Sequence, residues 1–128
     1  MARARAHIGE TNYRVEIKAG HHQLVADEHP ELGGKDVGPA PYEILLAALG
    51  ACTSITLKMY AQRKDWPLAE VDVGLVFTRE GDRGKIERTL TLTGDLDEAQ
   101  RARLADIAER TPVTLTLKAG ADIHTTLA

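Results

Sequence analysis

The chain has 128 residues, of which 43% are hydrophobic and 27% are charged, and its formal net charge at pH 7 is −3. These values are typical of one soluble globular domain over residues 1–128, and the length excludes two domains with separate cores. A net acidic chain offers no basic field to a phosphate backbone, so we expect no nucleic-acid partner.

Three features predict a cytoplasmic protein in a reducing environment, with no membrane partner. The N-terminal stretch MARARAHIG lacks the apolar core of a signal peptide. The longest uncharged run, residues 44–57, has 14 residues, which is short for a bilayer span and more typical of a buried helix. Cys52 is the only cysteine, which excludes a disulfide within the chain.

The N-terminal third predicts a small antiparallel meander. Tyr13, Val15 and Ile17 alternate with charged residues, as in a half-buried strand. After a glycine break, the weaker alternation of residues 22–26 predicts the next strand, and a short strand over residues 4–9 precedes both.

A long apolar helix is predicted after a loop over residues 27–41. Pro41 suits its first turn, Glu43 lies near the positive end of its dipole, and the helix should end at about Lys64. Residues 44–52 are apolar on every side of the helix, so protein should surround it. With only 4% aromatic residues, a domain this small often gains burial by pairing with a copy of itself, and we expect an interface here.

The second half predicts a hairpin and a helix. Residues 71–77 and 88–92 alternate like strands, and the glycine-containing segment 81–84 connects them. An amphipathic helix follows, with either Asp95 or Asp97 as its N-cap.

The C-terminal end is less uniform. The Thr/Leu alternation of residues 111–118 is typical of a strand, but Pro112 equally suits the start of a short helix. Residues 121–127 predict a final strand.

Cys52 leaves two interpretations open. Free cysteines are among the most buried residues, and most of them are inert. A thiol becomes a nucleophile only where its thiolate is stabilised. Its own helix cannot do this, because Cys52 lies about three turns from the helix N-terminus, so any activation must come from another segment.

The segment GPAPYEILLAALGACTS, followed by MYAQRKDWPL and VDVGLVFTRE, resembles the OsmC/Ohr family of thiol-dependent hydroperoxide reductases, in particular its OsmC-like (YhfA-like) branch. The resemblance continues through IERTLTLTGDLDEAQRARLADIAER and a final IHTTL, from about residue 20 onward. It implies an α+β fold with antiparallel sheets packed on two central helices. It also implies an intertwined homodimer with its thiols near the interface.

The family's chemistry implies two cysteines, a peroxide-attacking one that matches Cys52 and a resolving one in a Cys-Pro-Val-His stretch. This chain has Thr-Pro-Val-Thr there, so Thr111 occupies the resolving position and Thr114 that of the histidine. The first oxidation of Cys52 remains chemically open, but turnover would need an external thiol, and over-oxidation would compete.

The resemblance also implies a glutamate and an arginine beside the thiol. Glu43 is the candidate carboxylate, although the family pattern places it one residue earlier, at Tyr42. The alternative is that Glu43 only complements the helix N-terminus.

For the arginine, Arg14 on an early strand is the candidate. Arg88 and Arg79 remain open. For each, the competing interpretation is an ordinary solvent-exposed arginine on a strand.

The five histidines do not predict a metal site. Adjacent side chains on a strand, such as His21 and His22, point to opposite faces, and no Cys-x-x-Cys or His-x-x-x-His spacing occurs. We therefore expect no metal and no cofactor.

We expect thiol-based reduction of organic hydroperoxides, a form of oxidative-stress defence, with Cys52 as the nucleophile and an external thiol closing the cycle. The alternative is a non-catalytic dimer of the same fold that binds a small apolar ligand between its subunits.

Overall fold

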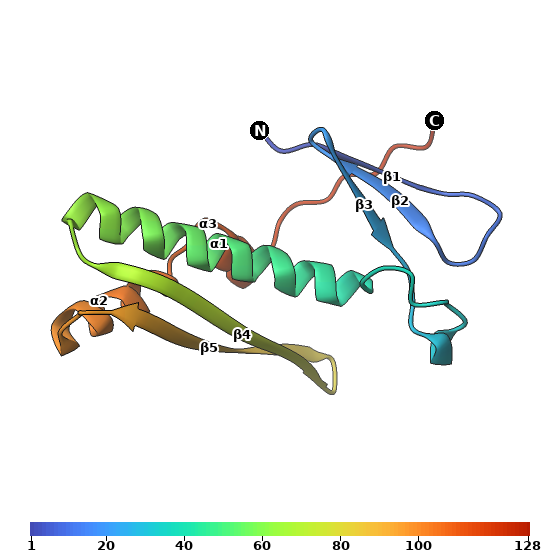
Figure 1. The fold of residues 1–128 in the computed structure, drawn as a ribbon. Helices are drawn as coiled ribbons and strands as arrows, with labels where there is room; N and C mark the ends of the chain where they lie inside the picture. The colour runs from blue at the N-terminus through green and yellow to red at the C-terminus, as the bar shows by residue number, and fades with distance from the viewer. The chain divides into compact units, whose positions relative to one another are not determined.

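The computed structural model describes all 128 residues, with the order of elements drawn in Figure 1. The elements are β1 (Ala4–Ile8), β2 (Val15–Ala19), β3 (His22–Ala26), the 3-10 turn η1 (Pro30–Leu32), α1 (Pro41–Lys64), β4 (Leu68–Glu80), β5 (Arg83–Gly94), α2 (Glu98–Ala108) and α3 (Pro112–Ala119). The chain forms two compact units, Met1–Leu45 and Leu46–Ala128, and α1 runs from the first into the second. A single domain over residues 1–128 stays a prediction.

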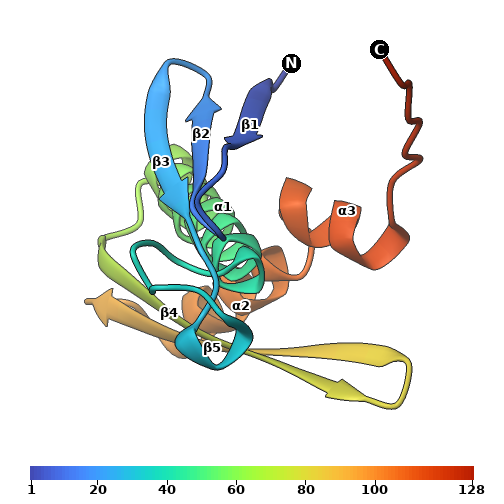
Figure 2. The same ribbon diagram turned by 90° about the vertical axis from the view of Figure 1, so that its right-hand side faces the viewer.

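The first unit contains a three-stranded antiparallel sheet in the order β1-β2-β3, and Figure 2 shows the strands side by side. Ile17 in the central strand pairs with Ala6 on one side and Leu24 on the other. Every second residue of β2 is half-buried, as the alternation predicts. The predicted meander is confirmed.

The loop between β3 and α1 is organised by the buried carboxylate of Asp27. It accepts hydrogen bonds from the backbone N–H groups of Glu28 at 2.8 Å, Lys35 at 3.1 Å and Val37 at 3.2 Å. Burial raises the pKa of Asp27, but these backbone donors together lower it below its usual value. A single side chain thus shapes the loop that leads into α1.

Helix α1 begins at Pro41 and ends at Lys64, as predicted. By length and composition it could cross a membrane, with 24 residues and a mean hydropathy of 1.6 over its most apolar window. The uncharged run of residues 44–57 therefore underestimates the apolar length of the helix, because a spanning window tolerates a few charges. This is weak evidence for a membrane span, because the core helix of a soluble protein passes the same test.

In the second unit, β4 and β5 form a long antiparallel hairpin joined at Gly81 and Asp82. Gly81 has a φ of 61°, which a glycine adopts without strain. One face of the hairpin carries the half-buried side chains, in cross-strand pairs such as Val73 with Leu90. The predicted hairpin is confirmed.

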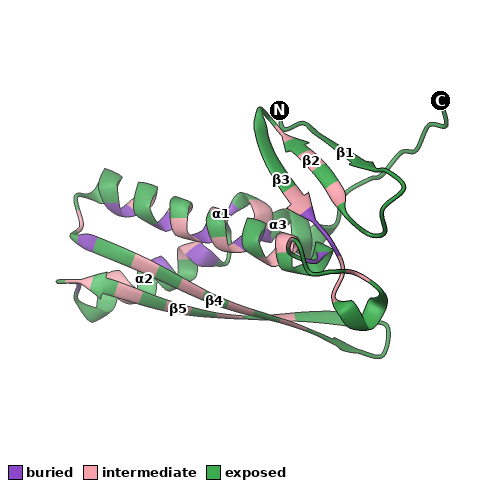
Figure 3. Cartoon of the chain, turned by 45° about the vertical axis from the view of Figure 1, so that its right-hand side comes forward, coloured by how far each residue is buried: buried purple, intermediate pink, exposed green.

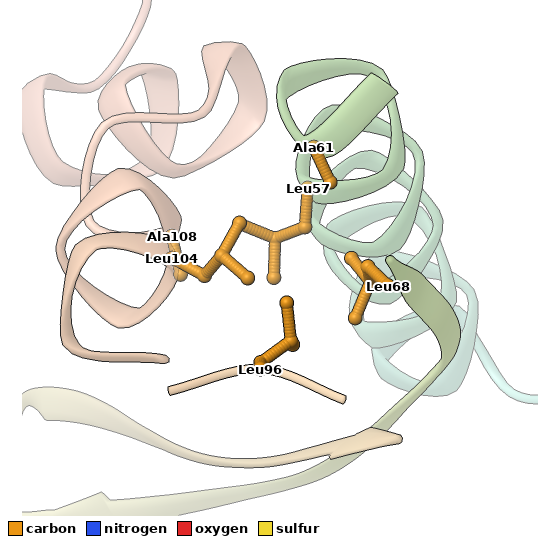
Figure 4. Packing of buried hydrophobic residues seen from close by; sticks show 6 residues of the cluster. All are labelled: Leu57, Ala61, Leu68, Leu96, Leu104 and Ala108. Atoms are coloured by element: carbon orange, nitrogen blue, oxygen red, sulfur yellow. The ribbon is translucent and has the colours of Figure 1, made fainter. Parts of the chain in front are cut away.

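The core of the second unit lies between α1, α2 and the start of the hairpin (Figure 4). It is aliphatic throughout, and its members are Leu57, Ala61, Leu68, Leu96, Leu104 and Ala108. Burying each leucine contributes about 1.5–3 kcal/mol. Figure 3 shows buried positions recurring along one side of α1 while other positions of the helix remain exposed.

The structure decides between two pairs of alternatives. Asp97, not Asp95, is the N-cap of α2, where it forms a capping box with Gln100. Residues 112–119 form helix α3, with Pro112 in its first turn and Thr111 as its N-cap.

The prediction of a strand over residues 121–127 is wrong. Residues 120–128 have no regular structure, and the side chains of Ile123 and Leu127 are exposed. Alternation shows which side chains could share a face, but a strand forms only where a neighbouring strand takes up its backbone hydrogen bonds. No strand of this chain pairs with the segment.

Candidate active site

The thiol of Cys52 lies at the N-terminal end of α3. The backbone N–H of Val113 donates to the Cys52 sulfur with an N–S distance of 3.5 Å. Val113 is the second residue of α3, so its N–H has no partner within the helix. The hydroxyl of Thr56, one turn further along α1, lies 4.0 Å from the sulfur. The half-buried thiol therefore faces the positive end of a helix other than its own.

The first turn of α3 is held by two threonine hydroxyls. The Thr111 hydroxyl accepts from the N–H of Thr114 at 3.4 Å, and the two hydroxyl oxygens lie 2.6 Å apart. Thr111 is completely buried and Thr114 nearly so. Thr111, which the resemblance places at the resolving position, is thus a helix cap in this chain.

Arg88 is a charged side chain in the half-buried row of the hairpin's inward face. It pairs across the strands with Leu75 and is flanked on its own strand by Ile86 and Leu90. Its side chain is only 11% exposed, so the interpretation of Arg88 as a solvent-exposed arginine is wrong. The signal in the sequence is an arginine at a position where the alternation calls for an apolar residue.

The Arg88 guanidinium joins three helices. One terminal nitrogen donates to the hydroxyls of Thr53 in α1, at 3.0 Å, and Thr114 in α3, at 2.9 Å. The other donates at 2.8 Å to the carbonyl oxygen of Ala108, at the end of α2, and at 3.2 Å to the carboxylate of Glu109. A cation at the C-terminal end of a helix also complements the helix dipole.

Glu109 lies between two cations. Its carboxylate accepts from Lys118 of α3 at 3.0 Å as well as from Arg88. The hydrogen bond from Lys118 is the main reason why the pKa of Glu109 is lowered, and Arg88 adds to it against the opposing effect of partial burial.

A cavity of about 330 Å³ lies beside this network. Its lining combines apolar and charged side chains, namely Leu49, Ile86, Leu117, Thr114, Arg88, Glu109 and Lys118. The volume falls at the lower end of the range of small-molecule pockets, about 300–1,000 Å³.

The other two predicted site residues, Glu43 and Arg14, lie in the first unit, where they are not paired with each other. The Glu43 carboxylate accepts from the N–H of Ala40 at 2.8 Å and lies 3.7 Å from the ring of His29. This geometry favours the interpretation of Glu43 as a complement to the N-terminus of α1. Arg14 is 44% exposed and contacts Glu16 at 3.5 Å. Arg79, the remaining candidate arginine, is exposed near the hairpin turn.

No group of three or more His, Cys, Asp or Glu side chains is placed to hold a metal ion. The expectation that His21 and His22 point to opposite faces is wrong, because their ring centroids lie 4.1 Å apart. His21 belongs to the turn before β3, where the alternation of a strand does not apply.

Comparison with known proteins finds a family that the sequence matches. A family model described as "OsmC-like protein" matches residues 33–126, whereas no curated protein matches the sequence. Among solved structures, the chain is similar to an OsmC-like protein from Mycoplasma pneumoniae, with 19% identity, a TM-score of 0.80, and coverage of 94% of this chain and 89% of that one.

Two further structures carry more specific names. One is an organic hydroperoxide resistance protein OsmC from Legionella pneumophila, with 22% identity, a TM-score of 0.69, and coverage of 95% of this chain and 92% of that one. The other is the organic hydroperoxide resistance protein OhrB of Bacillus subtilis, with 20% identity, a TM-score of 0.64, and coverage of 95% and 93%. These likenesses confirm the predicted α+β fold.

Proposed function

The chain belongs to the OsmC-like protein family, and we propose that it reduces organic hydroperoxides with Cys52 as the nucleophile and an external thiol as the reductant. The observation that carries this proposal is the N–H of Val113 directed at the Cys52 sulfur from the N-terminus of α3. Helix N-termini stabilise thiolates, and the thiolate is the form that attacks peroxides. Two structural relatives named as organic hydroperoxide resistance proteins support the substrate class.

In the first step, the Cys52 thiolate attacks one oxygen of the hydroperoxide. A sulfur–oxygen bond forms as the oxygen–oxygen bond breaks, and the alkoxide leaves and takes up a proton from water to give the alcohol. Cys52 is oxidised to a sulfenic acid, and the peroxide is reduced.

The second half of the cycle needs two equivalents of external thiol, because Cys52 is the only cysteine and the resemblance places Thr111 at the resolving position. The first thiol attacks the sulfenic sulfur, releases water and forms a mixed disulfide. The second attacks that disulfide, restores the Cys52 thiol and leaves with the first as an external disulfide. One hydroperoxide and two thiols thus yield one alcohol, one water and one disulfide.

A cytoplasmic homodimer completes the proposal, and the exposed side of α1 supports the dimer. Ala48, Ala51, Ile55 and Met59 follow one another at helical spacing and are all exposed, with Ile55 at 53% and Met59 at 52%. A second copy of the chain would bury them. We expect Ile55→Glu to dissociate the dimer in sedimentation. A charge at Leu49 would be a poorer test, because that side chain is buried within its own chain. If the wild type and Ile55→Glu both sediment as monomers, the dimer is contradicted.

The roles that the resemblance implies for Glu43 and Arg14 stay a prediction, and Glu43→Gln and Arg14→Met test them. A loss of peroxidase activity in both variants would support those roles. Full activity in either would remove that residue from the site.

The alternative function is the binding of a small apolar ligand without catalysis. The cavity lined by Leu49, Ile86 and Leu117 favours it, because its apolar part would accept a short aliphatic chain.

The reactivity of Cys52 separates the two functions. With cumene hydroperoxide and a dithiol, the wild type should consume peroxide, and dimedone should trap its sulfenic acid. Cys52→Ser should consume no peroxide, and it should unfold at the same temperature as the wild type. If dimedone gives no adduct and the wild type consumes no more peroxide than Cys52→Ser, hydroperoxide reduction is excluded and ligand binding is favoured.

A further inference from the structure

We propose that Arg88 is a positioning residue for Cys52, because it holds the N-terminus of α3 against the thiol. The proposal rests on the proposed function of Cys52 as the nucleophile. The terminal nitrogens of Arg88 donate to groups in and after three helices and not to the Cys52 sulfur, so the effect passes through the elements that Arg88 joins.

Burying the Arg88 guanidinium on an apolar face costs free energy unless hydrogen bonds offset the loss of water. A guanidinium on the apolar face of a hairpin must be fully hydrogen-bonded to be tolerated, and Arg88 is 11% exposed. Its two terminal nitrogens carry four N–H groups, and four acceptors lie within 3.2 Å of them. These groups are fully used by the protein, so they hold structure together rather than donate to the thiol.

The two hydroxyl acceptors belong to the residues that directly follow the thiol and its N–H donor in the sequence. Thr53 directly follows Cys52 in α1, and Thr114 directly follows Val113 in α3. One nitrogen of Arg88 binds both hydroxyls, which fixes the spacing between the two helices at the level of the sulfur and its N–H donor. The same Thr114 hydroxyl contacts the Thr111 cap, so the first turn of α3 and its distance from Cys52 are set together.

Lysine could not replace this arrangement. Its ammonium is a point charge with three donors, whereas Arg88 uses a planar fork to reach α1, α2 and α3 at once. The guanidinium also donates to the carbonyl oxygen of Ala108 at the end of α2. We therefore expect Arg88→Lys to keep the charge and lose the positioning.

The test compares Arg88 variants with an arginine of similar bonding elsewhere in the unit. Arg101 donates to the carbonyl oxygens of Leu92, Gly94 and Leu96, none of which lies in α3 or next to Cys52 in the sequence. In the full-length protein, Arg88→Met and Arg88→Lys should slow alkylation of Cys52 by iodoacetamide at neutral pH by about fivefold to tenfold. The loss should be recovered at high pH. Arg101→Met should keep the wild-type pH profile.

A second measurement observes the Val113 N–H directly. In nitrogen–proton correlation spectra, the Val113 amide should shift in both Arg88 variants and exchange with solvent faster than in wild type. The charged groups of the network are Arg88, Glu109 and Lys118. Glu109→Gln changes the local charge but leaves Arg88 bound to all three helices, so it should leave the Val113 signal nearly unchanged.

If Arg88→Met fails to fold, Thr114→Val and Thr114→Ser decide the question. The valine removes the acceptor in α3 and should reproduce the slow alkylation, whereas the serine keeps the hydroxyl and should restore the wild-type rate. Wild-type pH profiles and Val113 signals in Arg88→Lys and Thr114→Val would overturn the proposal. Because alkylation does not use peroxide, an Arg88-dependent thiol in a protein that consumes no peroxide would refute the proposed function alone.

Discussion

Helices α2 and α3 both begin with a side-chain N-cap, but they differ in the acceptors of their first N–H groups. At α2, the Asp97 carboxylate accepts from the N–H of Gln100 at 2.8 Å, and the Gln100 side chain accepts from the N–H of Asp97 at 2.9 Å. At α3, Thr111 caps the helix, but the N–H of Val113 is directed at the Cys52 sulfur of another helix. The comparison shows that a helix N-terminus becomes a candidate site only where the fold supplies an external acceptor.

The largest expected effect comes from placing a thiol at the α3 cap. Thr111→Cys should form a disulfide with Cys52 within one turnover, because Thr111 lies two residues before the Val113 N–H donor. Disulfide closure requires Cα atoms about 4.4–6.8 Å apart. The variant should resist over-oxidation and gain activity with dithiols, whereas the wild type should accumulate sulfinic acid under excess peroxide. Mass spectrometry after peroxide treatment measures both outcomes.

Asp97→Cys is the matched control for this experiment. It places a thiol at the cap of α2, which has no cysteine as its partner, so it should leave Cys52 to over-oxidise. Two free thiols in peroxide-treated Thr111→Cys would contradict the expected closeness of the α3 cap to Cys52.

A smaller effect is expected when the N–H donor itself is removed. Val113→Pro deletes the donor at the second position of α3, where a proline removes no hydrogen bond within the helix. Alkylation of Cys52 at neutral pH should slow by about fivefold to tenfold. Ala99→Pro, at the second position of α2, is the control and should cost similar stability without changing the alkylation rate. Equal alkylation rates of Cys52 in Val113→Pro and Ala99→Pro would show that the Val113 N–H does not affect the thiol.

Loss of the α2 cap should affect stability alone. Asp97→Ala should lower the free energy of unfolding by about 1 kcal/mol, the usual cost of losing an N-cap, and leave the alkylation rate of Cys52 unchanged. Urea unfolding measures the first and iodoacetamide the second. The conservative Thr111→Ser should change neither by much, since it keeps the hydroxyl. A change of thiol reactivity in Asp97→Ala would show that the two helix ends are coupled.

The smallest effect concerns pH. Lys118 and Arg88 lower the pKa of Glu109 in the folded protein. Its carboxylate therefore adds stability above the unfolded pKa of about 4.3 and loses it as pH falls through the folded pKa. Because the Glu109 side chain is 59% exposed, Glu109→Gln should cost at most about 1 kcal/mol at neutral pH. Urea unfolding at about pH 2 should show no difference, and a cost that persists there would point to lost packing instead.

The sequence by itself determined the local elements of this protein. The bounds of α1 follow from Pro41 at its start and from the Asp-Trp-Pro segment 65–67 after its end, and the hairpin follows from alternation around Gly81. These signals act between residues a few positions apart, because helix and strand periodicity and turn conformation are local properties of the backbone. The same locality explains why the sequence left Asp95 and Asp97 open as caps, since both are suitable residues at nearly the same place.

Only the tertiary structure decided which residues meet at the thiol. Val113 lies 61 positions from Cys52, and Arg88 lies 35 positions from Thr53, distances over which no periodicity carries information. The strand expected over residues 121–127 failed for the same reason, because a strand depends on a partner that its own residues do not specify. The charge of Arg88 favoured an exposed side chain although its neighbours placed it on the inward face, and only the tertiary structure shows the acceptors from three helices that allow its burial.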